Sequence, residues 1–297
     1  MSDDPFVTHR SLLFTVAYEM LGSAADAEDV VQETWLRWAD VGDPARGGTA
    51  WAEVRDPRAY LVRIVTRQAL NRLRTLARQR EDYVGEWLPE PLLTGPDVTE
   101  DVELAENVSI AMLTVLETLG PSERVVFVLH EVFDVPYEEI AGAVGKSAAA
   151  VRQIAHRARR HVAARRPRMR VSRTEQRQVV ERFLAALSTG DVPGLLDVLA
   201  PDVVLVADGG GLAPAARQPV EGSTRVAALL AGFARVAPGA QVGTLLLNGA
   251  VAARIDAAGE VNTAVTFVVE DGRITRIYAI RNPHKLRRLD AVAELRR

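Results

Sequence analysis

Apolar residues recur every three to four positions through the first 80 residues, and this spacing predicts amphipathic helices. A first helix is expected at 12–20 and should end at Gly22, because glycine commonly follows a helix C-terminus. Ser23 can cap a second helix that runs to Asp40, with acids in its first turn, where the helix dipole favours them. The following sequence GDPARGGT predicts a loop.

A third helix is predicted from Arg58 to about Arg80, and it carries two different stripes. Its apolar stripe consists of Leu61, Val65, Ala69, Leu73 and Leu76. Its polar stripe, on another face, consists of Arg63, Arg67, Asn71, Arg74 and Arg78.

The middle of the chain alternates between predicted linkers and helices. Residues 81–100 are predicted to form a linker, because prolines lack a hydrogen-bond donor and break helices, and three of them stand among acids here. Helices are predicted at 103–118, 121–133, 136–144 and 147–165. A second, basic linker, ARRPRMRVSR, is expected at 164–173.

From Thr174 onward the pattern of apolar residues changes from helical spacing alone to two helices followed by strand-like runs. Amphipathic helices are predicted at 175–191, with a stop at Gly190, and at 192–199. Strands are predicted at 202–209, 241–248, 250–256, 261–272 and 273–280, with a helix at 222–236 and the hairpin turn signal EDGR between the last two strands. This half is therefore expected to be an α+β domain with an antiparallel, curved sheet, and the sequence shows no internal repeat.

Composition narrows the possible chemistry. The chain has no cysteine, which excludes disulfides and thiolate metal sites and suits a reducing cytoplasm. The five histidines, His9, His130, His156, His161 and His284, show no ligand spacing, so we expect neither a metal site nor a cofactor. The sequence MSDDPFVTHR lacks the basic start of a secretory signal, and no apolar run could span a bilayer. A soluble, cytoplasmic protein without a membrane partner is expected.

The net charge of -3 hides a strong segregation of charge along the chain. Residues 57–80 hold seven arginines and no acid, residues 81–123 hold eleven acids and no Lys or Arg, and residues 146–173 hold ten Lys or Arg and no acid. A single charged run is usually a solvated face. Two basic blocks on predicted helices, separated by an acidic block, also indicate nucleic-acid binding.

Residues 137–160, YEEIAGAVGKSAAAVRQIAHRARR, have the pattern of a helix-turn-helix, with a tight turn at Gly145 and a helix cap at Ser147. Apolar positions of the second helix, such as Val151 and Ile154, should face the core. Five polar residues should face outward: Arg152, Gln153, His156, Arg157 and Arg160. Arg and Gln can bond guanine and adenine edges, and the neighbouring arginines can meet phosphates. The alternative is a helical hairpin with a basic solvated face.

The strings DAEDVVQETWLRW, AYLVRIVTRQALNRLR and LETLGPSERVVFVLHEVFDVPYEEIAGAVGKSAAAVRQIAHRARRHV resemble domains σ2 and σ4 of the extracytoplasmic-function sigma factors, subunits of RNA polymerase that bind promoter DNA. The resemblance covers residues 6–80 and 105–165. It implies that Asp29, Gln32, Glu33, Trp35 and Arg37 bind core RNA polymerase. It implies minus-10 contacts by Arg63, Arg67, Asn71 and Arg74, with Trp51 a stacking partner for an unstacked base or a packing residue. It places the helix with Arg152, Gln153, His156, Arg157 and Arg160 on the minus-35 element.

Residues 174–286 resemble the SnoaL-like, NTF2-like cone fold. With the strings WLPEPL, DGGG and NPHKL, the chain resembles the SigJ-type group of sigma factors, which carry this domain fused to σ4. The group usually has Asp where this chain has His284, which argues against a role that needs an anion there and allows local pH sensitivity. The implied domains are σ2 at 1–80, a linker at 81–104, σ4 at 105–166, a basic linker at 167–173 and a SnoaL-like domain at 174–297.

We hypothesise that WLPEPL, a preorganised apolar string, docks on the SnoaL-like domain and sets the placement of σ2 and σ4, so that this domain regulates the sigma factor in cis. The residues involved would be Trp87, Leu88, Pro89, Asp208, Gly209, Gly210, Gly211, Asn282, Pro283, Lys285 and Leu286. The alternative is a plain turn, a strand end and a flexible tether.

Three functions remain open on the sequence alone. The first is a cis-regulated sigma factor, and the second is a helix-turn-helix regulator whose SnoaL-like domain senses a ligand. The third is a SnoaL-type enzyme with a DNA-binding tether. Catalysis is not expected, because Arg254, Asp256 and Tyr278 are isolated candidates without a clear acid–base pair. A small apolar ligand in the cone stays open as a further partner, and is favoured over catalysis.

Overall fold

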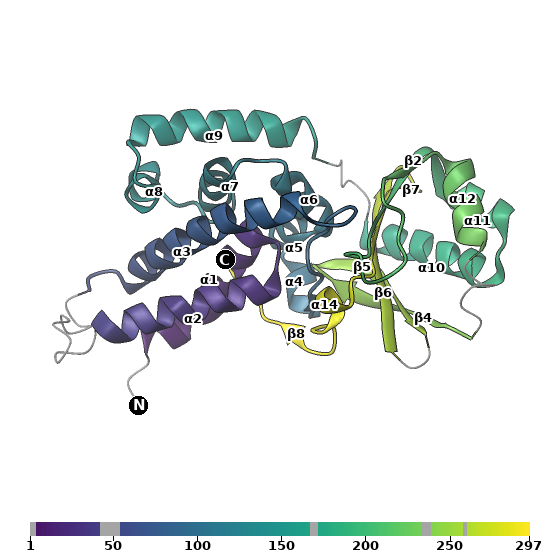
Figure 1. The fold of residues 1–297 in the computed structure, drawn as a ribbon, viewed down its shortest axis with the longest axis horizontal. Coiled ribbons are helices and arrows are strands. Elements are labelled where there is room, and N and C mark those ends of the chain that lie inside the picture. The colour runs from purple at the N-terminus through teal and green to yellow at the C-terminus, as the bar shows by residue number, and fades with distance from the viewer. Residues whose placement is uncertain (1–3, 42–53, 167–171, 233–238, 258–259) are drawn as a thin grey trace. The chain divides into compact units, whose positions relative to one another are not determined.

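The computed structural model describes residues 4–41, 54–166, 172–232, 239–257 and 260–297 (Figure 1). The chain forms two compact units. Unit 1 comprises residues 1–81, 115–165 and 294–297, and unit 2 comprises residues 82–114 and 166–293. Unit 1 therefore holds the helices predicted for σ2 and the σ4 helices from residue 115 onward, whereas residues 82–114, which include the start of the predicted σ4 domain, lie with the C-terminal sheet.

Three long helices form the first part of unit 1: α1 (Pro5–Leu21), α2 (Ala24–Val41) and α3 (Pro57–Glu81). Asp4 caps α1 by accepting a hydrogen bond from the backbone N–H of Phe6 at 2.9 Å. The predicted stop at Gly22 is confirmed, since this glycine has φ +66° and its N–H bonds the carbonyl of Tyr18. Helix α1 packs against both α2 and α3, so most of its surface is buried.

The second part of unit 1 contains α7 (Pro121–Phe127), α8 (Tyr137–Val144) and α9 (Ala148–Ala163). A π-helical turn at 128–132 continues α7, so the helix predicted at 121–133 changes its winding. Gly145 has φ +68°, and Ser147 accepts a hydrogen bond from the N–H of Ala150 at 3.2 Å. The predicted turn and cap of the helix-turn-helix are confirmed by these bonds.

The single helix predicted at 103–118 is wrong. The chain forms α5 (Val102–Val108) and α6 (Ile110–Glu117), with a break at Ser109, whose ψ of 144° is extended. The Ser109 hydroxyl bonds the carbonyl of Glu106 and accepts from the N–H of Met112, so it ends one helix and starts the next. Serine side chains compete with helical backbone bonds in this way, a signal that apolar periodicity does not carry.

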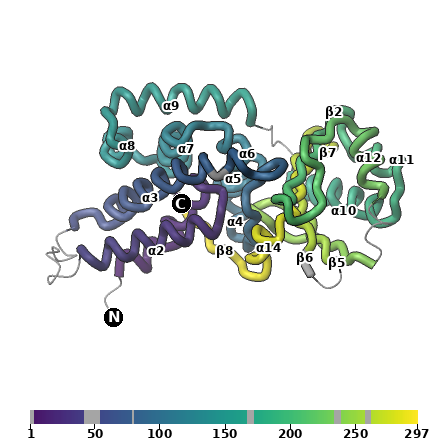
Figure 2. Tube along the Cα trace, viewed as in Figure 1, coloured from purple at the N-terminus to yellow at the C-terminus, as the bar shows by residue number. Residues whose placement is uncertain are grey.

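Unit 2 is built on a strongly bent sheet. Among the described residues its strands follow the order β3-β2-β7-β6-β5-β4-β1-β8. Their bounds are β1 (Leu93–Thr94), β2 (Leu199–Asp208), β3 (Val220–Glu221), β4 (Gln241–Leu247), β5 (Ala250–Ala257), β6 (Glu260–Glu270), β7 (Arg273–Ile280) and β8 (Val292–Ala293). Figure 2 shows the trace of β5, β6 and β7 running through this unit.

The expectation of a fully antiparallel sheet is wrong. Strand β2 pairs parallel with β7, and β1 pairs parallel with β8. The hairpins β4–β5, β5–β6 and β6–β7 are antiparallel, as local turn signals predict. The parallel pairs join segments far apart in sequence, so no turn signal announces them.

Helices cover the sheet and complete its core. Helix α10 (Arg173–Thr189) packs against β4, β5 and β6, while α11 (Val192–Val198) and α12 (Ser223–Ala231) contact β2. Phe183 of α10 meets Phe267 of β6 edge to face at 5.2 Å between ring centroids. A second buried cluster joins Leu88 and Ile110 to sheet residues and to Leu286 of α14 (Pro283–Leu286). The fold class predicted from sequence, helical parts followed by an α+β domain, is confirmed.

Candidate functional site

Helix α9 presents a continuous polar face to solvent. Val151, Ile154 and Ala158 are buried, as the pattern predicted. All five residues expected to face outward are exposed: Arg152, Gln153, His156, Arg157 and Arg160. The geometry of α8, the turn at Gly145 and α9 is therefore that of a helix-turn-helix with an accessible second helix.

Acidic neighbours neutralise part of this face. Arg152 pairs with Glu138 at 2.9 Å, and its guanidinium lies 5.9 Å from the centroid of the Tyr137 ring. Arg157 pairs with Glu123 at 3.5 Å. Both arginine side chains are more than half exposed, and such surface pairs contribute only about 0–1 kcal/mol. A polyanion such as DNA can therefore displace these carboxylates at little cost.

The polar stripe of α3 is also exposed, at Arg63, Arg67, Asn71 and Arg74. Arg67 does not point freely into solvent, however. Its Nη2 donates to the carbonyl of Gly142 at 2.9 Å and its Nε to that of Ala143 at 3.4 Å, both at the C-terminal end of α8. These carbonyls carry the negative end of the helix dipole, which favours a cation. Trp51 lies outside the described residues.

Helix α2 places a mixed acidic and apolar surface beside α3. Asp29, Gln32, Glu33, Trp35 and Arg37 are all exposed, and most of them line an open groove of about 530 Å³ with residues of α3. Two α3 side chains hold the acids: Gln68 donates to Glu33 at 2.5 Å, and Arg72 lies 3.6 Å from Asp29. Trp35 is 45% exposed, which leaves a large apolar side chain available to a partner.

In unit 2 the predicted linker is bound by a buried carboxylate. Asp208, at the end of β2, is fully buried and accepts from the Tyr83 hydroxyl at 2.6 Å, from the Leu88 N–H at 2.9 Å and from Lys285 Nζ at 2.6 Å. Its own carbonyl accepts from the N–H of Arg281 and of Asn282. A buried charge with three donors is satisfied, and removal of any donor would leave it costly.

The three glycines after Asp208 allow this segment to approach closely. Gly210 has φ +58°, and a Cβ there would lie 2.2 Å from the Asn282 side-chain nitrogen. Gly211 has φ +73°, and its Cβ would lie 3.2 Å from Val84. A Cβ at Gly209 would meet the carbonyl of Ala213 at 2.1 Å. A larger residue at Gly210 or Gly211 would therefore press against Tyr83 or Val84 of the 82–92 segment, whereas at Gly209 it would collide with residues 213–215.

The string Asn282–Leu286 closes the other side of the segment. Lys285 Nζ donates to the Leu88 carbonyl at 2.5 Å and lies 4.0 Å from the centroid of the Trp87 ring, a cation–π contact. The Asn282 amide donates to the Tyr83 hydroxyl at 2.8 Å. Of the remaining expected residues, Pro89 and Leu286 are buried, whereas Pro283 and His284 are exposed. The structure thus brings WLPEPL, DGGG and NPHKL together.

Sequence reasoning missed two residues of this site. Tyr83 bridges Asp208 and Asn282, and it stands in an acidic run where a lone aromatic residue is the only signal. Burial raises the pKa of its hydroxyl, with the Asp208 carboxylate adding to the effect. Asn248 accepts from the Leu92 N–H at 2.9 Å and donates to the Val108 carbonyl at 2.8 Å, so it fastens the far end of the segment. Its Asn-Gly dipeptide was visible as a hairpin turn signal.

Unit 1 contains a buried ionic cluster that the sequence did not reveal. Arg124 is 1% exposed and pairs with Glu117, which also pairs with Arg80. Arg124 also donates to the backbone carbonyl of Glu19 at 3.2 and 3.3 Å. Burial raises the pKa of Glu19 to about 8, and its carboxylate oxygens have no hydrogen-bond partner among the described residues.

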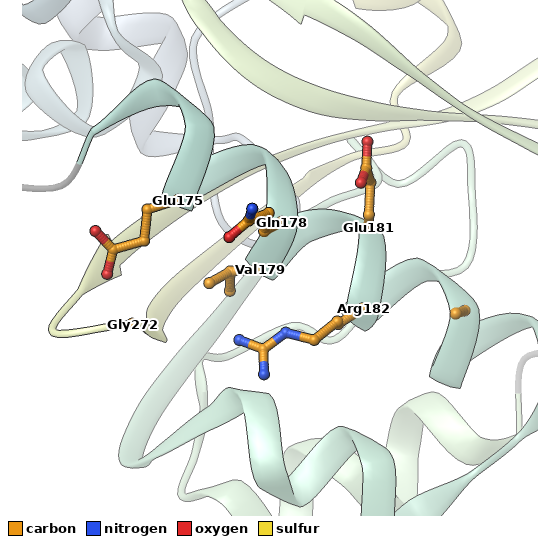
Figure 3. Close-up of a pocket in the computed structure, with 7 residues that line it drawn as sticks. Glu175, Gln178, Val179, Glu181, Arg182 and Gly272 are labelled. Carbon is orange, nitrogen blue, oxygen red and sulfur yellow. The ribbon is translucent and has the colours of Figure 1, made fainter.

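Among the described residues of unit 2, nothing supports a ligand inside the cone. Buried apolar side chains, including Phe183, Phe267 and Ile277, fill the space between α10 and the sheet. A groove of about 700 Å³ lies along α10, and Figure 3 shows Glu175, Gln178 and Arg182 around it, with Gly272 at the β6–β7 turn. This groove is open to solvent and is lined by four long polar side chains, unlike an enclosed ligand site.

The catalytic candidates also lack a reactive arrangement. Arg254 pairs with Asp256 at 2.8 Å and with Asp290 at 3.2 Å, so its charge is used in ion pairs. Burial raises the pKa of Tyr278 to about 12, which keeps the phenol protonated. In the part of the chain that the structure describes, no cluster of three His, Asp or Glu could hold a metal ion. No described helix combines the length and apolar character needed to cross a bilayer.

Comparison with known families matches the chain in three places. The Sigma-70 region 2 family matches residues 6–79, the Sigma-70 region 4 family matches residues 109–162, and the SnoaL-like domain family matches residues 180–277.

Two curated relatives and one solved structure match along almost the whole chain. The ECF RNA polymerase sigma factor SigJ of Mycobacterium tuberculosis is 39% identical over 96% of this chain and 93% of its own length. The probable ECF RNA polymerase sigma factor SigI of the same species is 33% identical over 94% of this chain and 92% of its own length. The crystal structure of SigJ superposes with a TM-score of 0.75 over 95% of this chain and 96% of SigJ, at 36% identity.

Proposed function

Because this chain belongs to the extracytoplasmic-function RNA polymerase sigma factors that carry a SnoaL-like domain, we propose that the docked 82–92 segment lets this domain control the sigma factor in cis. A sigma factor binds core RNA polymerase and directs it to promoter DNA, and the chain has both sigma-70 regions for this task. The proposal places this action in the cytoplasm, where polymerase and promoter DNA are found.

The proposed division of labour follows the three exposed surfaces of unit 1. The α2 surface, with Asp29, Gln32, Glu33, Trp35 and Arg37, binds the polymerase. The polar face of α3, with Arg63, Arg67, Asn71 and Arg74, binds the minus-10 region, where Trp51 is a further candidate. The α9 face, with Arg152, Gln153, His156, Arg157 and Arg160, binds the minus-35 element. Exposure of these side chains, and the low cost of displacing their ion pairs, support these roles.

One observation carries the regulatory part of the proposal. The segment that leads from the region 2 helices to the region 4 helices is bound through Asp208, a fully buried carboxylate of the SnoaL-like sheet. A polypeptide fixed at Tyr83, Leu88 and Leu92 loses the freedom of a flexible linker. The domain therefore restricts the positions that the two DNA-binding regions can reach.

This proposal assigns the SnoaL-like domain a binding role and not a catalytic one. Its buried polar groups at Asp208, Asn248 and Asn282 are occupied by contacts to the 82–92 and 102–108 segments. A surface filled by the chain itself leaves no need for a substrate to explain these residues.

The test is reconstituted transcription with core polymerase on sheared genomic DNA of the source organism, with transcript ends mapped by sequencing. The full chain should direct the polymerase to a defined set of start sites. Asp208→Ala should change the yield at those sites at least about tenfold, because it leaves three donors without a partner. Asp202→Ala, an exposed position of the same strand, is the control and should match the wild type.

Two results would contradict the proposal in different ways. Failure of the wild-type chain to select any start site would reject promoter recognition. Equal transcription by wild type and Asp208→Ala, with hydrogen exchange showing a released 82–92 segment, would leave the sigma factor role intact and reject control through this segment.

A further inference from the structure

The chain leaves unit 2 at Ala293, and its next four residues belong to unit 1. Leu295 is 3% exposed, and the N–H of Arg296 donates to the Thr15 hydroxyl of α1 at 2.9 Å. The Ser11 hydroxyl donates to the Glu294 carboxylate at 3.3 Å. In Figure 1 the C end of the chain is marked beside α1. The segment 294–297 is thus a built contact and not a trailing end.

The contacts follow one stripe of α1. Ser11, Thr15 and Glu19 are four residues apart, so they lie on the same face of the helix. Glu294 meets the first, Arg296 meets the second, and the charge of Arg297 acts on the carboxyl of the third. The segment therefore runs along α1 in a fixed register.

The stripe ends at the buried ionic cluster. Arg124, which belongs to the region 4 helices, donates to the Glu19 carbonyl, and it pairs with Glu117. Arg80, at the end of α3, pairs with the same Glu117. Since Arg124 and Arg297 both act on Glu19, the segment and the region 4 helices depend on the same side of α1. Loss of the region 4 contacts would leave the buried Arg124 without its full set of partners, and loss of the segment would uncover the stripe beside them.

We call unit 1 closed when this cluster joins α1, α3 and the region 4 helices, as it does in the structure. The closed unit has a direct consequence for DNA binding. In the same unit, Arg67 of the proposed minus-10 surface is bonded to the carbonyls of Gly142 and Ala143 in α8. These bonds occupy the Nε and Nη2 donors of Arg67, so that edge of the guanidinium cannot bind a phosphate at the same time. The closed unit is therefore a form in which the minus-10 surface is partly covered by the minus-35 module.

The segment is also continuous with the SnoaL-like sheet. Strand β8 ends at Ala293, immediately before the segment, and pairs with β1 of the docked 82–94 region. The segment and the β1–β8 pair are therefore covalently adjacent in the chain.

We propose that residues 294–297 form a latch that binds the Ser11–Thr15–Glu19 stripe and holds the region 2 and region 4 helices in the closed unit. The latch rests on the proposed function: besides the docked 82–92 segment, residues 294–297 would be a second means by which the SnoaL-like domain controls the DNA-binding regions. Its partner is a surface of the same chain, so no other protein is required.

The absence of cysteine allows a direct test in the full chain. Ala77→Cys in α3 and Ala149→Cys in α9 occupy exposed positions and would carry a donor and an acceptor dye. Leu295→Asp should raise the ratio of open to closed molecules at least about tenfold, seen as a fall in energy transfer. Arg296→Ala is the matched control: its side chain is exposed and the latch uses only its N–H, so transfer should not change.

Thr15→Val removes the hydroxyl that accepts from Arg296 at nearly constant volume, and it should open the unit about fivefold. If Leu295→Asp fails to fold by circular dichroism, Thr15→Val decides. Unchanged transfer in a folded Leu295→Asp, or in Thr15→Val when that variant decides, overturns the latch. Start-site selection by the wild-type chain with core polymerase is scored separately, so failure of the sigma factor role is distinguishable from failure of the latch.

Discussion

The buried site at Asp208 and the exposed face of α9 use similar charged groups for opposite purposes. Asp208 and Lys285 are 0% and 12% exposed, and their contacts with each other, Tyr83 and Leu88 lie within unit 2. Arg152 and Arg157 on α9 are more than half exposed, and their carboxylate partners are weakly held. Burial makes a charge a fixed structural contact, whereas exposure keeps it available for exchange with a phosphate.

The largest expected effect on stability comes from removal of the buried acid, Asp208. Asp208→Ala should lower the free energy of unfolding by about 3–5 kcal/mol, because Lys285 and two other donors lose their acceptor. Chemical denaturation followed by tryptophan fluorescence measures this change. Asp202→Ala on the same strand should change the value by less than about 0.5 kcal/mol, and equal effects would remove the distinction between buried and exposed acids.

The ionic cluster of unit 1 gives the comparison a pH dependence. Glu19 has a pKa raised to about 8 in the folded chain, so the folded form holds its proton over a range where the unfolded form has lost it. This raised pKa contributes stability that is full below about pH 4.5 and is lost as pH rises to about 8. Glutamine is neutral at every pH. Glu19→Gln should therefore reduce, by a few kcal/mol, the fall in the free energy of unfolding that occurs as the pH rises. Denaturation curves of both proteins at pH 5 to 8 should diverge, and parallel curves would contradict the assignment.

Substitution of Gly210, which lies close to the Asn282 side chain, should lower the free energy of unfolding by a smaller amount. Gly210→Ala must accept φ +58° and a contact with the Asn282 side chain, so we expect a loss of about 1–3 kcal/mol. Hydrogen exchange should show the loss concentrated at residues 83–92. Gly239→Ala shares a positive φ but has no neighbour within 4 Å of its Cβ, and it separates backbone strain from collision.

The smallest stability effects, and specific functional ones, are expected on α9. Arg152→Ala should change stability by less than about 0.5 kcal/mol, because its ion pair is exposed. If it reads a base edge, it should cost about 1–3 kcal/mol of binding to the minus-35 element. Arg160→Ala should instead lower the salt slope of binding by about 1, as expected for a phosphate contact. Binding titrations at several salt concentrations measure both, with Arg177→Ala in α10 as the control.

Local signals predicted most of the elements. Gly22, Gly145 and Ser147 end or start helices through bonds within a few residues, so the sequence alone locates them. The outward face of α9 was likewise predictable from helical period. The break at Ser109 was not, because a serine inside an apolar pattern has no unique local meaning.

Contacts between distant segments were predictable only in part. The three short strings indicated that the 87–92 segment meets Asp208 and Lys285, but not which atoms bond. Tyr83 and Asn248 act on residues more than 100 positions away, and nothing in their local pattern gives a partner. Glu19 lies in a helix whose apolar period suggests an ordinary core, and its buried charge becomes visible only with Arg124 in place.

Strand β1 shows that the boundaries of the sequence families along the chain differ from the boundaries of the two compact units. It is encoded between regions 2 and 4, yet it pairs with β4 and β8 of the SnoaL-like sheet. A truncation at Arg173 would strip the covering from Leu88 and Ile110, which are buried in that domain's second core. Such a truncation would expose apolar surface and remove the native contacts of residues 82–114, so the product would be prone to aggregate. It would not be a sigma factor that lacks only its regulator. Single substitutions in the intact chain separate the two roles better.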